Sequence, residues 1–164
     1  MSEIYKYLSV LIVMLFRTHI VFSVFVYLVL GYFVEMPLYV LFFVLLATVF
    51  VDVDIKNSSF GNRLCFRPLQ FFVKHRGILH SLFFGLFLSL ILGSVSLWTG
   101  FGFFVGYLSH LFLDCLTLSG VKLFWPFGFR IRGFVRSGSM LEDVLFVLML
   151  LLDIFLVLFS IMVY

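Results

Sequence analysis

The sequence predicts an all-α integral membrane protein, and its composition and the pattern of its apolar residues support this. Of the 164 residues, 64% are hydrophobic and 12% are charged, and the mean hydropathy is +1.25. A soluble domain is about half apolar and about a quarter charged. The apolar residues form long runs between short polar stretches, as expected for helices that cross a membrane. We therefore expect one polytopic helical bundle, residues 1–164, with about five transmembrane helices and a short N-terminal helix.

The N-terminal stretch, residues 1–17, is expected to form that short helix. Its apolar run, residues 4–16, is about 20 Å long as a helix, which is too short for a hydrocarbon core of about 30 Å. We expect it to lie in the membrane interface or to re-enter the membrane, or else to extend the next span. Thr18 is a possible N-cap of that span. Residues 1–16 lack a small-residue cleavage site, so no cleavable signal peptide is expected.

The remaining residues, 18–164, are expected to form the core of the domain. Tight turns are expected at residues 35–37 and 99–100, and polar loops at residues 55–74 and 119–139. These divide the sequence into five apolar spans, at residues 20–34, 38–51, 78–98, 101–118 and 140–164.

Lys and Arg residues gather in the two polar loops. Each loop holds four of them, and with Arg76 this makes nine of the eleven in the chain. The positive-inside rule places both loops in the cytoplasm. Topology explains this positive charge, so we expect no nucleic-acid partner. Cys65 and Cys115 lie in or beside these loops and are expected to be free thiols.

His110 and Asp114 stand four residues apart in an otherwise apolar run. On a helix this spacing puts both side chains on one face. An imidazole and a carboxylate are costly in hydrocarbon unless they pair, bind a metal ion or line a wet cavity. The pair therefore indicates either a structural hydrogen bond between helices or part of a metal site.

Other polar residues fall on the same side of the predicted membrane. All four histidines and four of the eight acids lie at or near the cytoplasmic ends of spans: His19, Asp52, Asp54, His75, His80, His110, Asp114 and Glu142. Scattered structural polar residues would divide between the two faces. Imidazoles and carboxylates together suit Zn²⁺, Mn²⁺ or Fe²⁺, and the convergence favours a shared metal centre.

Several of these residues also have plain structural interpretations. Asp52 and Asp54 could be a solvated helix end, although their period-two spacing in an extended backbone would aim both carboxylates one way. Arg76 could anchor the topology or hold a phosphate bidentately. Glu142 could be a ligand, a base or an acid that suits a helix start. Asp153 lies 11 residues later on the same helix face and about 16 Å deeper, as an interior acid.

The sequence also resembles a known family, the YdjM-type bacterial and archaeal membrane proteins, described as membrane-bound metal-dependent hydrolases. The resemblance rests on Thr18-His19, on Asp52-Val53-Asp54, on His75-Arg76-Gly77-Ile78-Leu79-His80-Ser81, on residues 106–126 with Ser109-His110 and Asp114, and on Glu142 after Gly138-Ser139.

Three positions depart from the family pattern. Val51 stands in place of Pro, Ile55 in place of His and Leu79 in place of Thr. The change at Ile55 removes one potential ligand. The family's likeness to all-helical, multi-zinc phospholipases C and nucleases implies phosphoester hydrolysis in a prokaryotic inner membrane.

From the residues and the resemblance together we expect a membrane-bound metal-dependent hydrolase, a phosphoesterase acting on a lipid or another membrane-delivered substrate. Zinc is the expected ion, with Mn, Fe or Mg as alternatives. His19 and Glu142 are ligand or acid–base candidates, and Arg76 would orient the phosphate. The expected metal ligands are Asp52, Asp54, His75, His80, His110 and Asp114.

Other function classes are less consistent with the sequence. The main alternative is a non-enzymatic metal-binding membrane protein or a divalent-ion carrier, but a carrier needs polar groups through the whole membrane. A lipid phosphatase with a phospho-histidine intermediate would need a Lys where Phe60 stands and a Pro-Ser-Gly-His element. An intramembrane metalloprotease would need His-Glu-x-x-His, which the sequence lacks.

Overall fold

The computed structural model describes residues 2–52 and 77–163, with residues 2–15 described only as helical backbone. This part of the chain forms five α-helices and one short 3-10 helix. In chain order the elements are α1 (Ser2–Phe33), α2 (Tyr39–Val51), η3 (Ile78–His80), α4 (Leu82–Gly93), α5 (Leu97–Leu116) and α6 (Met140–Val163). The all-α prediction is confirmed for these residues.

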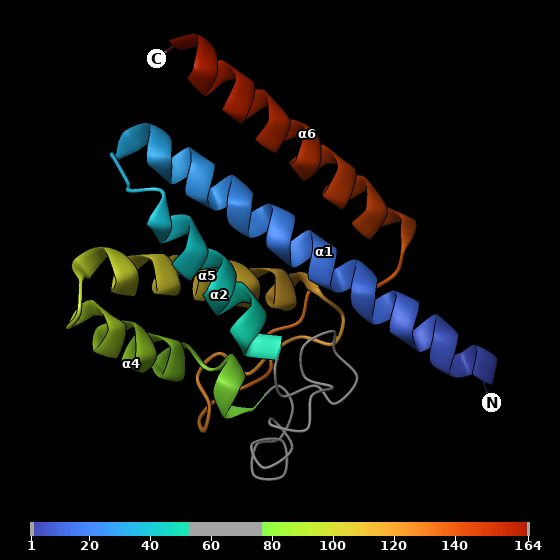
Figure 1. Cartoon of the computed structure of the whole chain (residues 1–164). Helices are drawn as coiled ribbons and strands as arrows, with labels where there is room; N and C mark the ends of the chain where they lie inside the picture. The colour runs from blue at the N-terminus through green and yellow to red at the C-terminus, as the bar shows by residue number, and fades with distance from the viewer. Residues whose placement is uncertain (1, 53–76, 164) are drawn as a thin grey trace.

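Helix α5 is the centre of the arrangement. It packs against α1, α2 and α4, whereas α6 packs chiefly along α1 at the outside of the bundle (Figure 1). Helices α2 and α5 end, and α4 and α6 begin, at the same end of the bundle (Figure 1). The polar residues at these helix ends are therefore gathered by the topology.

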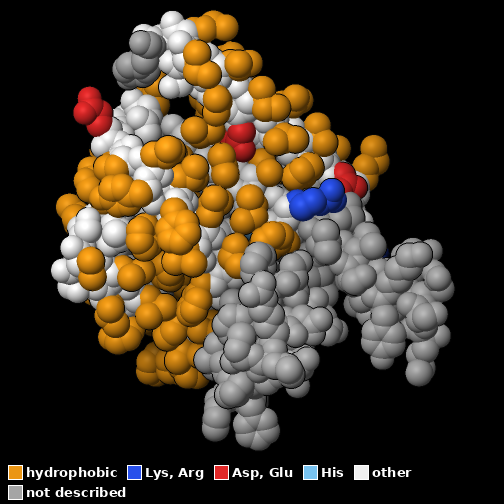
Figure 2. Space-filling model, viewed as in Figure 1, with side chains coloured by type: hydrophobic (Ala, Val, Ile, Leu, Met, Phe, Trp, Pro, Cys, Tyr) orange, Lys and Arg blue, Asp and Glu red, His pale blue; other side chains and the backbone are white. Residues whose placement is uncertain are grey.

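Three helices are long and apolar enough to cross a membrane: Phe16–Phe33 of α1, Leu97–Leu116 and Met140–Val163. Helices α2 and α4 are apolar but have only 13 and 12 residues, or about 20 and 18 Å. The expected count of five spanning helices is therefore not shown. Hydrophobic side chains spread over the described part of the face in Figure 2, and few charged side chains appear on it, as expected for a surface in contact with lipid.

The prediction of a separate N-terminal helix is wrong. Residues 2–33 form one continuous helix, which is the alternative in which residues 4–16 extend the next span. No Gly or Pro occurs before Gly31 to interrupt the helix. Thr18 therefore lies inside α1 and does not cap a helix.

The predicted span at residues 78–98 is also wrong as a single helix. The chain forms η3 and α4, turns at residues 94–96 and has already begun α5 at Leu97. Thr99 lies in the first turn of α5, where its hydroxyl donates to the carbonyl of Ser96 at 2.7 Å. Gly100 lies inside α5, where a Cβ would meet the backbone of Gly93. This glycine therefore permits close helix packing and does not form the turn.

Helices α2 and α5 approach each other very closely along one face of α5. A Cβ at Gly102 or Gly106 would collide with the backbone of Val40 or Val44. The carbonyl of Gly106 also accepts a hydrogen bond from the Thr48 hydroxyl, at 3.3 Å. Small residues at i and i+4 allow such an approach between membrane helices.

The segment between α5 and α6, residues 117–139, folds back on itself without a helix. Val121 and Ile131 exchange two backbone hydrogen bonds of 2.9 Å, and Thr117 forms an isolated bridge with Val135. Val121 and Val135 are buried. We call residues 117–139 the α5–α6 loop; the expected polar loop, residues 119–139, lies within it.

Candidate metal centre

Five predicted site residues converge at one end of the bundle. They come from four elements: His19 from α1, Asp52 from the C-cap of α2, His80 from η3, and His110 and Asp114 from α5. The three histidines and Asp114 have side chains no more than 4% exposed, whereas Asp52 is 19% exposed. The cluster is therefore buried, and Asp52 forms its more accessible side.

The imidazole of His110 has a defined orientation. Its Nδ1 lies 3.0 Å from the carbonyl oxygen of Thr48. A carbonyl can only accept, so Nδ1 carries the hydrogen and the lone pair of a neutral ring is on Nε2. This Nε2 faces Asp52 Oδ1 at 3.5 Å and Asp114 Oδ2 at 3.8 Å. A backbone carbonyl that fixes the tautomer of a histidine in this way is a common feature of metal sites.

His80 faces the same two carboxylates. Its Nε2 lies 3.3 Å from Asp114 Oδ2 and 3.9 Å from Asp52 Oδ1. Charge-assisted hydrogen bonds are shorter, about 2.7–2.9 Å. Ligand atoms about 2.0–2.2 Å from a tetrahedral ion lie roughly 3.3–3.6 Å from one another. The 3.3 Å between His80 Nε2 and Asp114 Oδ2 is thus closer to the spacing of two ligands around one ion.

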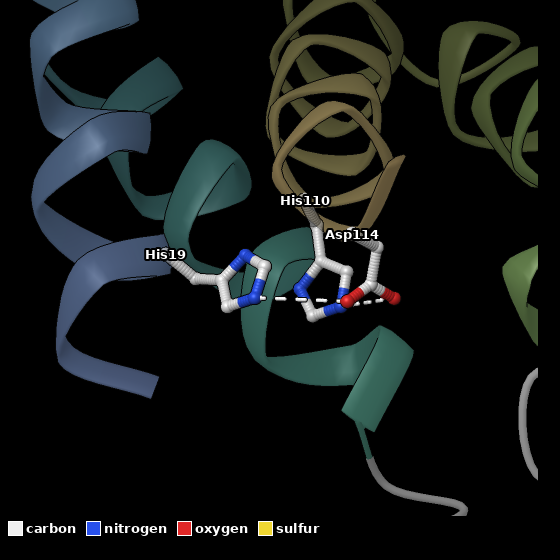
Figure 3. A group of neighbouring side chains, drawn as sticks. All are labelled: His19, His110 and Asp114. Carbon is white, nitrogen blue, oxygen red and sulfur yellow. Dashed lines mark ion pairs between the residues drawn. The ribbon is translucent and has the colours of Figure 1, made fainter. Parts of the chain in front are cut away.

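His19 adds a third imidazole, next to His110 and to Oδ1 of Asp114. Its Nε2 is 4.0 Å from Asp114 Oδ1, and its ring stacks on that of His110 with centroids 4.1 Å apart. Figure 3 shows that His19 projects from α1 toward the pair on α5. The two oxygens of Asp114 therefore face different histidines.

Two overlapping groups could each hold an ion: His19, His110 and Asp114, and Asp52, His80 and His110. His110 belongs to both, but the lone pair of its Nε2 can bind only one ion. Three imidazoles with two carboxylates are a suitable donor set for a divalent transition metal. A bound cation would also compensate the negative charge of the two carboxylates, which lie close together in a buried place. The residues present therefore fit a divalent ion.

The helices place these residues through simple local rules. Gly102, Gly106, His110 and Asp114 are each four residues apart, so the close contact with α2 and the site lie on one face of α5. Thr48 and Asp52 have the same spacing on α2. The backbone that carries His80 is held by Tyr107, whose hydroxyl lies 2.6 Å from the Leu79 carbonyl oxygen and 3.1 Å from that of Ser81.

Glu142 lies near the cluster but is engaged elsewhere. It is buried, it accepts a hydrogen bond from the Thr18 hydroxyl at 3.1 Å, and it accepts another from the backbone N–H of Gly138 at 2.6 Å. With His19 it lines a cavity of about 30 Å³ between α1 and the start of α6. Glu142 therefore joins the start of α6 to α1, one residue from His19.

Three expected site residues, Asp54, His75 and Arg76, lie outside the described residues. Asp153 shares the buried face of α6 with Glu142, as its spacing predicted. The sequence reasoning did not identify Thr48 and Tyr107 as supporting residues. The spacing of Thr48 four residues before Asp52 was the one available signal; nothing local indicated the contact of Tyr107 with η3.

Fold and site together define a class: a helical membrane protein with a buried His/Asp cluster that could hold a metal ion. The chain belongs to the YdjM inner membrane protein family, whose model matches residues 14–163. It is an inner membrane protein with several candidate spans.

The chain is similar to the curated inner membrane proteins YdjM of Escherichia coli (strain K12) and of Shigella flexneri. Each is 37% identical over 90 residues, which cover 49% of this chain and 46% of the relative. The match thus spans about half the length of these relatives. No solved structure matches the chain.

Proposed function

We propose that this protein is a metal-dependent hydrolase of the inner membrane, a phosphoesterase that acts on a lipid or another membrane-delivered substrate. The observation that carries the proposal is the convergence of His19, Asp52, His80, His110 and Asp114 from four separate elements. A merely structural pair would need only two of them. The site lies at the end of the bundle from which the Lys- and Arg-rich α5–α6 loop emerges, which supports a cytoplasmic orientation.

The ligand set proposed for one ion is Asp52, His80, His110 and Asp114, with His19 on the second oxygen of Asp114. Asp54 and His75 complete the expected set. Zinc suits this mixture of imidazole and carboxylate, and Mn, Fe or Mg are the alternatives. When bound, the ion supplies Lewis-acid chemistry: it activates water and stabilises charge on a phosphoryl group.

The residues of the chain would perform the remaining tasks. The Thr48 carbonyl holds His110 in the tautomer that presents Nε2 to the site. Asp52, as a ligand, would form the more accessible side of the site. His19 and Glu142 are the acid–base candidates on the other side, and Arg76 would orient the phosphate. Burial of the other four cluster residues keeps bulk water out of most of the site.

The test combines metal analysis with a phosphoester screen on purified protein. Asp114→Asn and His110→Ala should each lose at least about 100-fold in metal affinity, since a direct ligand contributes more than the outer groups that cost 10–100-fold. Both should lose activity and still insert, because the apolar spans carry insertion. Asp153→Asn is the matched control: it is the same change at a buried acid of a span, and it should keep both metal and activity.

Titration with added metals must accompany the analysis, because a weakly held Mg²⁺ can be lost during purification. Stoichiometric metal without hydrolysis of any phosphoester would support the non-enzymatic metal-binding alternative. If no metal binds at any concentration and Asp114→Asn lowers only the thermal stability, both the hydrolase proposal and the non-enzymatic metal-binding alternative are contradicted.

A further inference from the structure

The α5–α6 loop carries exposed cations and exposed aromatic rings on one short segment. Lys122, Arg130, Arg132 and Arg136 are all exposed. Phe127, Phe129 and Phe134 are 75%, 76% and 74% exposed, and Trp125 is 38% exposed. Residues 119–139 contain no Asp or Glu, so the positive charge of this segment is not offset within it.

The backbone of this loop fixes its depth in the membrane. It is irregular and contains only isolated bridges, and irregular backbone exposed to lipid does not occur within the hydrocarbon core. Three Phe rings that are about three-quarters exposed would in turn be costly in bulk water. Both conditions are met at the level of the lipid headgroups, where aromatic and basic residues are enriched.

The loop also contacts the elements of the metal centre on both sides. The Leu123 carbonyl accepts a hydrogen bond from the Leu82 N–H at 2.8 Å, and the Ser81 hydroxyl donates to the Trp125 carbonyl at 3.3 Å. Ser81 and Leu82 directly follow His80. At its other end, Thr117 and Val135 line the small cavity that His19 and Glu142 also line.

We propose that the α5–α6 loop is a binding surface for anionic phospholipid headgroups at the rim of the metal centre. Its four cations engage headgroup phosphates, and its aromatic rings lie at the boundary between headgroups and acyl chains. Lipid binding by the loop stands on the observations above. The further step, that the substrate is an anionic phospholipid, rests on the proposed function.

The test uses Trp125 as a reporter. The chain has two Trp residues, so Trp98→Phe leaves only Trp125. This variant is placed in vesicles with a fixed fraction of phosphatidylglycerol or phosphatidylcholine, each brominated near the headgroup end of its acyl chains. Chelator is present throughout, so the result does not depend on a metal ion or on hydrolysis.

Brominated phosphatidylglycerol should quench Trp125 more strongly than brominated phosphatidylcholine, and added salt should reduce the difference. Changing Lys122, Arg130, Arg132 and Arg136 to Gln should remove the preference. Each cation removed should lower the relative affinity for phosphatidylglycerol by up to about five-fold. Arg17→Gln, which removes an exposed cation outside the loop, should leave it unchanged.

Equal quenching by the two lipids, quenching by neither, or a preference that survives loss of the four loop cations would overturn the proposal. If the variant with all four loop cations changed to Gln does not fold, the salt dependence of quenching in Trp98→Phe still tests the proposal. A negative result in the quenching experiment would not affect the proposed metal centre. A negative result in the metal analysis would not affect the proposed lipid-binding surface.

Discussion

Helices α5 and α6 are both long and apolar enough to cross the membrane, but they differ in what surrounds them. Within an 18-residue window of α5 the mean hydropathy is 1.2 and 56% of the residues are buried, compared with 3.0 and 6% for α6. By hydropathy alone α6 is the stronger membrane helix. The weaker one, α5, carries His110 and Asp114 of the site.

The difference has a physical cause. Helix α5 is enclosed by three helices, so its Gly, Ser, His and Asp residues contact protein and not lipid. Helix α6 has one main neighbour, and its only buried residues are the two acids Glu142 and Asp153. Glu142 and Asp153 of α6, like His110 and Asp114 of α5, turn toward protein, as expected for ionisable groups where hydrocarbon is the solvent. Low hydropathy in a span therefore indicates burial and a candidate site.

The largest effect on stability should come from adding one carbon to the crowded face of α5. In Gly106→Ala the new methyl group meets the backbone of Val44, which cannot move aside as a side chain would. We expect a loss of about 1–3 kcal/mol in stability and at least about a ten-fold loss in metal affinity, because α2 carries Thr48 and Asp52. Thermal unfolding in detergent and metal titration measure the two effects.

The matched control adds one carbon to α6. Val147 is 51% exposed, so Val147→Ile should change stability by no more than about 0.5 kcal/mol and leave metal affinity unchanged. If the two variants behaved alike, the proposed contrast between an enclosed helix and a lipid-facing helix would be wrong.

An effect on metal binding, with a smaller effect on stability, is expected from the face of α5 that holds η3. Tyr107→Phe keeps the ring against Gly85 but removes the hydroxyl that contacts the Leu79 and Ser81 carbonyl oxygens. His80 should then be held less firmly, and metal affinity should fall by about 10–100-fold, the range for groups that support a ligand. Isothermal titration with Zn²⁺ measures this change.

Tyr32→Phe is the control for that experiment. Tyr32 is 59% exposed, so loss of its hydroxyl should not affect metal binding. A purely structural Tyr107 would lower the unfolding temperature of Tyr107→Phe without changing its affinity for Zn²⁺, and this result would remove Tyr107 from the proposed support of the site.

Much of the site could be predicted because helical periodicity is local. The spacing of His110 and Asp114 predicted a shared face, and the Lys/Arg bias placed His19, Asp52 and His80 on the same side. The structure brings these five together. The turn at residues 35–37 and the start of α6 at Met140 were likewise marked by local signals.

The predicted helix boundaries were wrong where two local signals competed, or where a contact distant in sequence determined whether the helix continued. Arg17 and Thr18 looked like a break between helices, but α1 continues and Thr18 bonds to Glu142, 124 residues away. Both Gly93-Ser94 and Thr99-Gly100 resemble turns. The chain turns at the first, and Gly100 instead allows α4 and α5 to pack closely.

X-ray absorption of zinc-loaded protein shows whether imidazoles of the cluster bind a metal ion. We predict stoichiometric zinc with nitrogen and oxygen ligands at about 2.0–2.2 Å and the outer-shell scattering of at least two imidazoles, with that scattering reduced in His110→Ala. Zinc bound without imidazole scattering, through sulfur, or with a spectrum unchanged in His110→Ala would contradict the proposed site.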